Sequence, residues 1–252
     1  MLIFDIETRP LPLDRLKQVV PPFASQLQHP GEFDPGSVKI GNIKDPEKID
    51  AKIELAKREH ESRAAKFADD VVEEESRYWS DIQSKAALEA ELATVCAIGY
   101  TNPGGKIAID LDLEMPEEQI IRRFWQKYES CRSASPVRNI VGYNSHRFDI
   151  PFLVRRSWNL DIQVPPGVFT PTGYVGHVFV DLLDRWQCGD RRAYVKLDKL
   201  CRANGLPGKP DDCTGALFHE LVSNESTRSA AIGYLENDLV MTLGLARKLQ
   251  LI

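Results

Sequence analysis

The 252-residue sequence lacks a continuous apolar stretch of the length that a membrane span requires. Its apolar start, Met1 to Phe4, is interrupted by Asp5 before the core of a signal peptide could form. Cysteine is scarce: five residues are scattered along the chain, and no two have the Cys-x-x-Cys spacing of a zinc or redox site. We therefore expect an intracellular, cytoplasmic protein with reduced thiols and no membrane partner.

The sequence also has no glycine-rich phosphate loop, no dinucleotide fingerprint and no internal repeat, so a nucleotide cofactor is not indicated. The composition, with 42% apolar and 27% charged residues, is ordinary for a soluble globular protein. A chain of this length can form one α/β domain, and we expect a single domain over residues 1–252.

The net charge of −5 is unevenly distributed. Residues 45–91 hold 14 acidic and 8 basic residues, and the remainder of the chain therefore carries +1. Residues 132–209 hold 12 basic and 6 acidic residues, which makes this stretch a candidate for phosphate binding. Solvated helix faces are the alternative interpretation.

Three acidic motifs follow one another along the chain. Asp5 and Glu7 lie two residues apart in the apolar run 1–7, which is typical of a buried strand, so their side chains share one face. Two adjacent carboxylates are costly to bury unless a cation or hydrogen bonds offset their charge. The pair therefore points to metal binding.

The other two motifs lie at a predicted strand-to-helix turn and on a late helix. Asn144, Phe148 and Asp149 follow a short apolar run, and Pro151 places Asp149 at or just before a helix N-terminus. Tyr234 and Asp238 are four residues apart in a segment with helical periodicity, so they lie on one helix face.

In this order, the three motifs resemble those of the DEDDy 3′-to-5′ exonucleases of the ribonuclease H-like superfamily. They are most similar to the proofreading exonuclease domain of family B DNA polymerases and its free-standing relatives. The sister subgroup has His five residues before the last Asp, where this chain has Gly233. The resemblance implies an α/β fold in which helices flank a mixed β-sheet. It also implies 3′-to-5′ hydrolysis of single-stranded DNA to nucleoside 5′-monophosphates.

The resemblance further implies the roles of the motif residues. Asp5, Glu7, Asp149 and Asp238 would hold two divalent cations, Mg²⁺ or Mn²⁺. Tyr234 would orient the attacking water and could accept its proton, for which a nearby cation must help, because a free phenol is a poor base at neutral pH. Three residues are expected to contact the substrate: Thr8, Asn144 and Phe148. For Phe148, packing in the core is the alternative. Replication or repair proteins are possible partners, although the sequence identifies none.

Residues 45–91 have no counterpart in the family core. Asp45-Pro46 is a helix-start signal, and neither glycine nor proline occurs from there to Leu92. We expect a long helix or a helical hairpin inserted between the first and second strands. It is interpreted as a solvated helix that packs one stripe on the core, or else as a clamp on the single-stranded substrate or an arm for a partner.

Two other functions stay open from the sequence alone. The chain can be a nucleic-acid-binding or scaffolding module that keeps the fold without turnover, because a fold does not guarantee an activity. It can also be a 3′-to-5′ exoribonuclease, since discrimination between DNA and RNA depends on how the site treats a 2′-hydroxyl.

Overall fold

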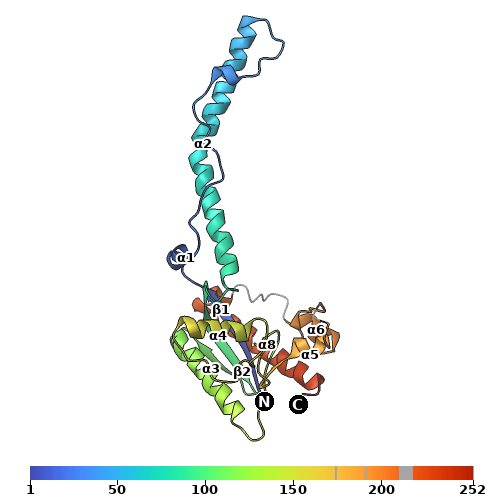
Figure 1. Ribbon diagram of the computed structural model, residues 1–252. Helices are drawn as coiled ribbons and strands as arrows, with labels where there is room; N and C mark the ends of the chain where they lie inside the picture. The colour runs from blue at the N-terminus through green and yellow to red at the C-terminus, as the bar shows by residue number, and fades with distance from the viewer. Residues whose placement is uncertain (174, 191, 210–217, 252) are drawn as a thin grey trace. The chain divides into compact units, whose positions relative to one another are not determined.

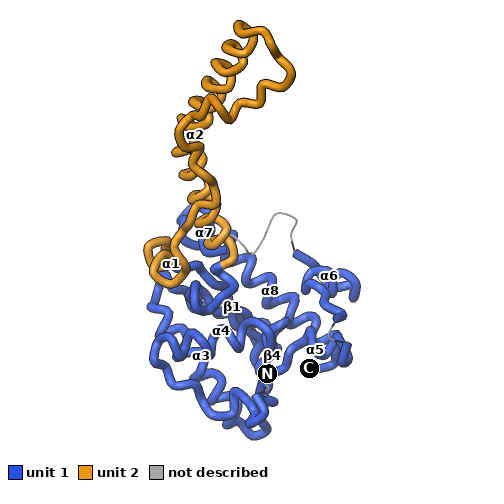
Figure 2. Tube along the Cα trace, turned by 45° about the horizontal axis from the view of Figure 1, so that its top comes forward, with its two compact units in different colours: residues 1–11, 86–252 blue, residues 12–85 orange. Residues whose placement is uncertain are grey.

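The computed structural model describes residues 1–173, 175–190, 192–209 and 218–251. The chain forms two compact units, which Figure 2 shows in different colours. The first unit comprises residues 1–11 and 86–252, and the second comprises residues 12–85. The assignment of the whole chain to one domain stays a prediction.

The first unit is built on a mixed five-stranded sheet, as expected. The strands are β1 (Leu2–Pro10), β2 (Ala93–Thr101), β3 (Ala108–Leu111), β4 (Ile140–Gly142) and β5 (Phe179–Asp181). Their order in the sheet is β3-β2-β1-β4-β5. The pairs β1–β2 and β2–β3 are antiparallel, whereas β1–β4 and β4–β5 are parallel.

Helices cover both faces of this sheet (Figure 1). They are α3 (Glu117–Arg132), α4 (Asp149–Asn159), α5 (Leu182–Gln187), α6 (Leu197–Ala203), α7 (Phe218–Ser223) and α8 (Arg228–Lys248). The aromatic and aliphatic side chains of α3 and α4 pack on one face, and α6 and α8 pack on the other. The predicted α/β class and mixed topology are confirmed.

The alternation of side chains along β1 decides which face receives its acidic residues. Phe4 and Ile6 belong to the cluster formed with α3 and α4. Ile3 belongs to the opposite cluster, which contains Leu239 of α8. Because side chains two apart on a strand share a face, Asp5 and Glu7 lie on the side of α8.

Gly99 lets α8 approach that face closely. It is paired with Asp5 in the β1–β2 register. A Cβ atom at Gly99 would lie 2.8 Å from Leu239 Cδ1 and 3.0 Å from Leu235 Cγ, closer than carbon atoms pack. The missing side chain in β2 therefore sets how near α8 can lie to the acidic face of β1.

The second unit contains α1 (Leu13–Val19), a short 3₁₀ helix (Pro35–Ser37) and the 41-residue helix α2 (Pro46–Ala86). The inserted segment is thus one continuous helix and not a hairpin. Asp45 Oδ1 accepts a hydrogen bond from the Glu47 amide, as expected at a helix start.

An extended, proline-rich segment packs antiparallel along α2 in place of a second helix. Its ring contacts with α2, given as centroid distances, are Phe23–Tyr78 at 5.7 Å, His29–Phe67 at 4.8 Å and Phe33–His60 at 5.6 Å. The apolar stripe seen in the sequence is therefore covered within this unit. The frequent prolines explain why the covering segment is extended rather than helical.

Among the described residues, no helix combines the length and the apolarity of a membrane span. Cys96, Cys131, Cys188 and Cys201 are free thiols. Cys213 lies outside the described residues. The glycine and prolines of residues 207–212 predict a loop, of which residues 210–212 also lie outside the described part.

Candidate active site

The three motifs meet at one cavity of the first unit, with a volume of about 430 Å³. Its lining residues are Asp5, Tyr143, Asn144, Tyr194, Lys196, Leu197, Asp198, Lys209, Tyr234 and Asp238. Residues far apart in the sequence are thus brought together by the packing of α8 against β1 and by the turn that follows β4.

Three carboxylates form a compact group at this cavity. One oxygen from each of Asp5, Glu7 and Asp238 lies within 4.8 Å of the others. Asp149, the first residue of α4, is buried outside that group, and its Oδ1 accepts a hydrogen bond of 3.3 Å from the amide of Ile6 on β1. The fourth carboxylate is therefore held against the backbone between Asp5 and Glu7.

Burial raises the pKa values of all four groups, and repulsion from the other carboxylates of the site adds to the shift for Asp5 and Glu7. The pKa of Asp5 is well above its ordinary value because of burial and then because of the Asp149, Asp238 and Glu7 charges. Burial raises the pKa of Asp149 to about 7. The pKa values of Glu7 and Asp238 are also raised, chiefly by burial. Such a cluster is costly without cations, which offset the repulsion.

The donor set fits divalent metal ions. All the candidate ligands are carboxylate oxygens, which Mg²⁺ and Mn²⁺ prefer. Asp238 Oδ1 is buried and has no hydrogen-bond partner among the described residues. A buried, unpaired carboxylate oxygen facing two other carboxylates is the arrangement that a hard cation would complete.

Tyr234 and Lys209 lie beside Asp238 at the edge of the carboxylate group. Lys209 Nζ donates to Tyr234 Oη and, at 2.8 Å, to Asp238 Oδ2. Burial and the Asp238 charge raise the pKa of the Tyr234 phenol to about 12, although Lys209 opposes the shift. In the metal-free site the phenol therefore stays protonated at neutral pH, and accepting a proton would require a nearby cation to lower its pKa.

Sequence reasoning did not identify Lys209 as part of the site. Its backbone amide donates to Asp198 Oδ1 at 2.6 Å, and Arg202 Nη2 donates to its carbonyl at 2.6 Å. These contacts connect Lys209 to α6. Only its membership of the basic stretch 132–209 was visible in the sequence, because a lone lysine in a Gly-Pro loop has no periodic signal.

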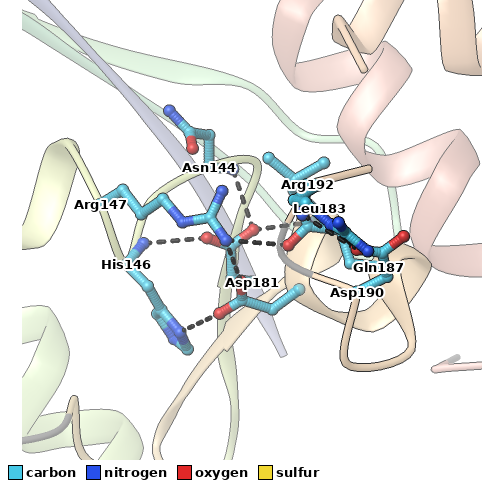
Figure 3. Close-up of polar contacts among 9 residues, drawn as sticks. Asn144, His146, Arg147, Asp181, Leu183, Gln187, Asp190 and Arg192 are labelled. Carbon is cyan, nitrogen blue, oxygen red and sulfur yellow. Dashed lines mark hydrogen bonds and ion pairs between the residues drawn. The ribbon is translucent and has the colours of Figure 1, made fainter. Parts of the chain in front are cut away.

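The second motif is held by Asp181, at the end of β5, as Figure 3 shows. Asp181 Oδ1 accepts from the Asn144 amide at 2.9 Å, and Oδ2 accepts from the His146 amide at 3.0 Å. Asn144 adopts a positive φ of 59°, which is uncommon for a residue other than glycine. The buried Asp181 carboxylate thus stabilises the sharp turn that leads to Asp149.

Asp181 also caps α5 by accepting from the Leu183 amide at 2.8 Å. With His146 and Asp184 it forms a second group whose spacing suits a metal ion. Both Asp181 oxygens are already hydrogen-bonded to backbone amides, and His146 Nδ1 is 2.8 Å from Asp184 Oδ2. These contacts make the group a support for the turn rather than a metal centre.

Two of the predicted substrate contacts lie in positions with structural roles. Thr8 Oγ1 donates to the carbonyl of Ala87 at 2.6 Å, so its hydroxyl ties β1 to the chain after α2. Phe148 packs against the α3–α4 core, with its ring centroid 5.5 Å from that of Phe152. Asn144 lines the cavity. Substrate contact by all three stays a prediction.

Residues 88–252 match the model of a family described as a predicted 3′-5′ exonuclease related to the exonuclease domain of PolB. The matched region contains the second and third motifs, whereas β1, which carries the first motif, precedes it.

Two relatives illustrate the similarity. The chain is 28% identical over 165 residues to DNA polymerase 2 of Aeropyrum pernix, an alignment that covers 61% of this chain and 20% of the polymerase. It is similar in fold to the family B DNA polymerase of Pyrobaculum calidifontis, with a TM-score of 0.53 and 21% identity over 66% of this chain and 23% of that one. The chain thus spans about a fifth of the length of the curated relative that it matches.

Proposed function

The chain belongs to this family of predicted 3′-5′ exonucleases related to the exonuclease domain of PolB, and we propose that it removes nucleotides from the 3′ end of single-stranded DNA as nucleoside 5′-monophosphates. The observation that carries the proposal is the group formed by Asp5, Glu7 and Asp238, with Asp149 beside it. DNA is the preferred substrate because the matched relatives are named as DNA polymerases.

The four carboxylates would hold two divalent cations, Mg²⁺ or Mn²⁺. Asp5, Glu7 and Asp238 have mutually close oxygens and would hold one, while Asp5 and Asp149 would hold the other. When bound, the cations supply an activated water and stabilise negative charge on the leaving 3′ oxygen. Release of protons should accompany their binding, because the carboxyl pKa values are raised in the free site.

Tyr234 would orient the attacking water through its hydroxyl, which is protonated at neutral pH in the metal-free site. Lys209 fixes that hydroxyl by donating to it, and the same ammonium group partly offsets the charge of Asp238. Asn144 would donate to the terminal sugar or phosphate from the cavity wall. Thr8 and Phe148 would act at the margin of the site, by fixing the backbone beside Glu7 and the start of α4.

The proposal is tested by incubating 5′-labelled single-stranded DNA and RNA of one sequence with the protein in Mg²⁺, Mn²⁺ or EDTA, beside Asp5→Ala. We expect a metal-dependent ladder that shortens DNA from the 3′ end and that the variant does not produce. Faster degradation of RNA would indicate the exoribonuclease instead. Absence of cleavage, together with a metal-induced rise in melting temperature, would indicate a binding module without turnover.

A further inference from the structure

The cavity has a second wall, which carries an aromatic ring and an ammonium group. It is formed by residues 194–198, the segment that leads into α6, and neither the motifs nor the matched family description assigns it a role. The cavity volume of about 430 Å³ lies in the range of sites that enclose small organic ligands. The cavity therefore has room for one nucleotide unit of a bound strand beside this wall.

This wall is fixed relative to the catalytic residues. The hydroxyl of Tyr143, the residue before Asn144, donates to the carbonyl of Val195. The Lys196 carbonyl accepts from the Leu200 amide at 3.0 Å in the first turn of α6, and Leu200 is buried in the cluster that contains Leu239 of α8. The wall is thus anchored both to the second motif and to the helix that carries the third.

Tyr194 stands out on this wall because it is an aromatic residue that stays 59% exposed. A large aromatic ring is usually removed from water when it serves only to pack a core. An exposed ring at the rim of a cavity that contains catalytic carboxylates is suited to stack on a base. Because every base has an aromatic face, stacking on this ring would impose no sequence preference.

Lys196 supplies a positive charge on the same wall. It is exposed, and its ammonium group forms no ion pair with any carboxylate in the described part of the chain. The other charges of the wall are already paired, since Asp198 accepts from Arg202 Nε at 2.9 Å and from the Lys209 amide. Lys196 is therefore available for a phosphate of the strand.

We propose that Tyr194 and Lys196 form a subsite for one nucleotide unit of a single-stranded substrate, in which the Tyr194 ring stacks on the base and the Lys196 ammonium contacts the adjacent phosphate. The proposal rests on the proposed exonuclease function and extends it. Base and phosphate are held without sequence preference, and the strand is directed toward Asp5 and Asp238.

The first experiment compares the kinetics of Tyr194→Ala, Tyr194→Phe and Lys196→Gln on a single-stranded DNA oligonucleotide. Loss of a stacking ring should raise KM roughly 5- to 150-fold with kcat nearly unchanged. Phe keeps the ring and should retain a KM close to that of the wild type. Lys196→Gln should raise KM and reduce the slope of log KM against log salt by about 0.7, the value for one single-strand phosphate.

Matched controls come from residues outside the cavity. Trp158→Ala removes a 64% exposed aromatic ring from α4, and Lys199→Gln removes an exposed lysine from α6. Both controls should leave KM and the salt slope unchanged. An effect of Tyr194→Ala no larger than that of Trp158→Ala, or a salt slope unaltered by Lys196→Gln, would overturn the subsite.

A second measurement separates this proposal from the proposed function. Binding of a fluorescent oligonucleotide to Asp5→Asn is measured with and without Tyr194→Ala, using normal DNA and DNA with abasic positions at its 3′ end. The Tyr194→Ala effect should vanish on the abasic strand. If binding depends on Tyr194 but the wild type does not hydrolyse DNA, only the exonuclease function is refuted. If the wild type hydrolyses DNA without dependence on Tyr194, only the subsite is refuted. If neither binding nor hydrolysis is seen, both are refuted.

Discussion

Replacing Asp149 by asparagine should make the metal-free protein respond differently to pH. Burial raises the pKa of Asp149 from 3.8 to about 7. Between pH 3.8 and about pH 7, the Asp149 carboxyl group therefore binds more protons in the folded state than in the unfolded chain. For that reason the free energy of unfolding falls as the pH rises through this interval. Below about pH 4 both states are protonated and the penalty is absent.

The size of the effect follows from the shift. A difference of about 3 pKa units corresponds to about 4 kcal/mol that the wild type loses between pH 4 and pH 7.5. In Asp149→Asn the side-chain carbonyl can still accept from the Ile6 amide, but the new amide group is left without a partner of its own, at a cost of about 1–3 kcal/mol at every pH. The variant should therefore be less stable than the wild type at pH 4 and more stable, by about 1–3 kcal/mol, at pH 7.5.

Urea unfolding in EDTA, followed by tryptophan fluorescence from pH 4 to pH 8, measures the difference. Asp69→Asn, which removes an exposed carboxylate from α2, is the control and should follow the wild-type profile. Saturating Mg²⁺ should flatten the wild-type profile, because bound cations offset the buried charge. Parallel profiles for the wild type and Asp149→Asn, within about 1 kcal/mol over the whole range, would show that burial of Asp149 does not destabilise the protein at neutral pH.

Three further substitutions test how the site is built. Tyr234→Phe should reduce kcat on the order of 10²-fold while calorimetry shows metal binding unchanged, and an unaltered rate would remove the hydroxyl from the mechanism. Asp181→Asn should cost about 1–3 kcal/mol of unfolding free energy and lower kcat, since one backbone amide of the turn loses its acceptor; an unchanged kcat would separate the turn from catalysis. Gly99→Ala should lower the unfolding free energy by about 1–3 kcal/mol and reduce kcat more than it alters KM, because its Cβ would displace α8; a variant with wild-type melting and kcat would contradict the close approach.

The sequence predicted the elements that its local patterns encode. The apolar run at residues 1–7, the proline near the start of α4 and the helical spacing of Tyr234 and Asp238 each placed a motif on the correct element. The sequence also predicted a long helix or a helical hairpin, and the structure has the single helix. It did not predict that the proline-rich segment covers this helix, because an extended segment has no periodicity to reveal its partner.

The parts of the site that sequence reasoning missed depend on tertiary contacts. Lys209 reaches Asp238 from a loop 29 residues earlier, and Asp181 reaches the Asn144 turn from 37 residues later. Tyr194 is distinguished only by its exposure beside the cavity. The role of Gly99 likewise becomes visible only when Leu239 is seen against it, since a glycine in a strand has several common explanations.

The identity of the product released with Mg²⁺ is the sharpest test of the proposed exonuclease, because a two-metal carboxylate site acting at a 3′ end determines both which bond breaks and which fragment carries the phosphate. Single-stranded DNA is incubated with the wild type and with Asp5→Asn, and the products are separated by chromatography. We expect nucleoside 5′-monophosphates, released one at a time from the 3′ end by the wild type and absent with the variant. Nucleoside 3′-phosphates, internal fragments, or equal release by the two proteins would contradict it.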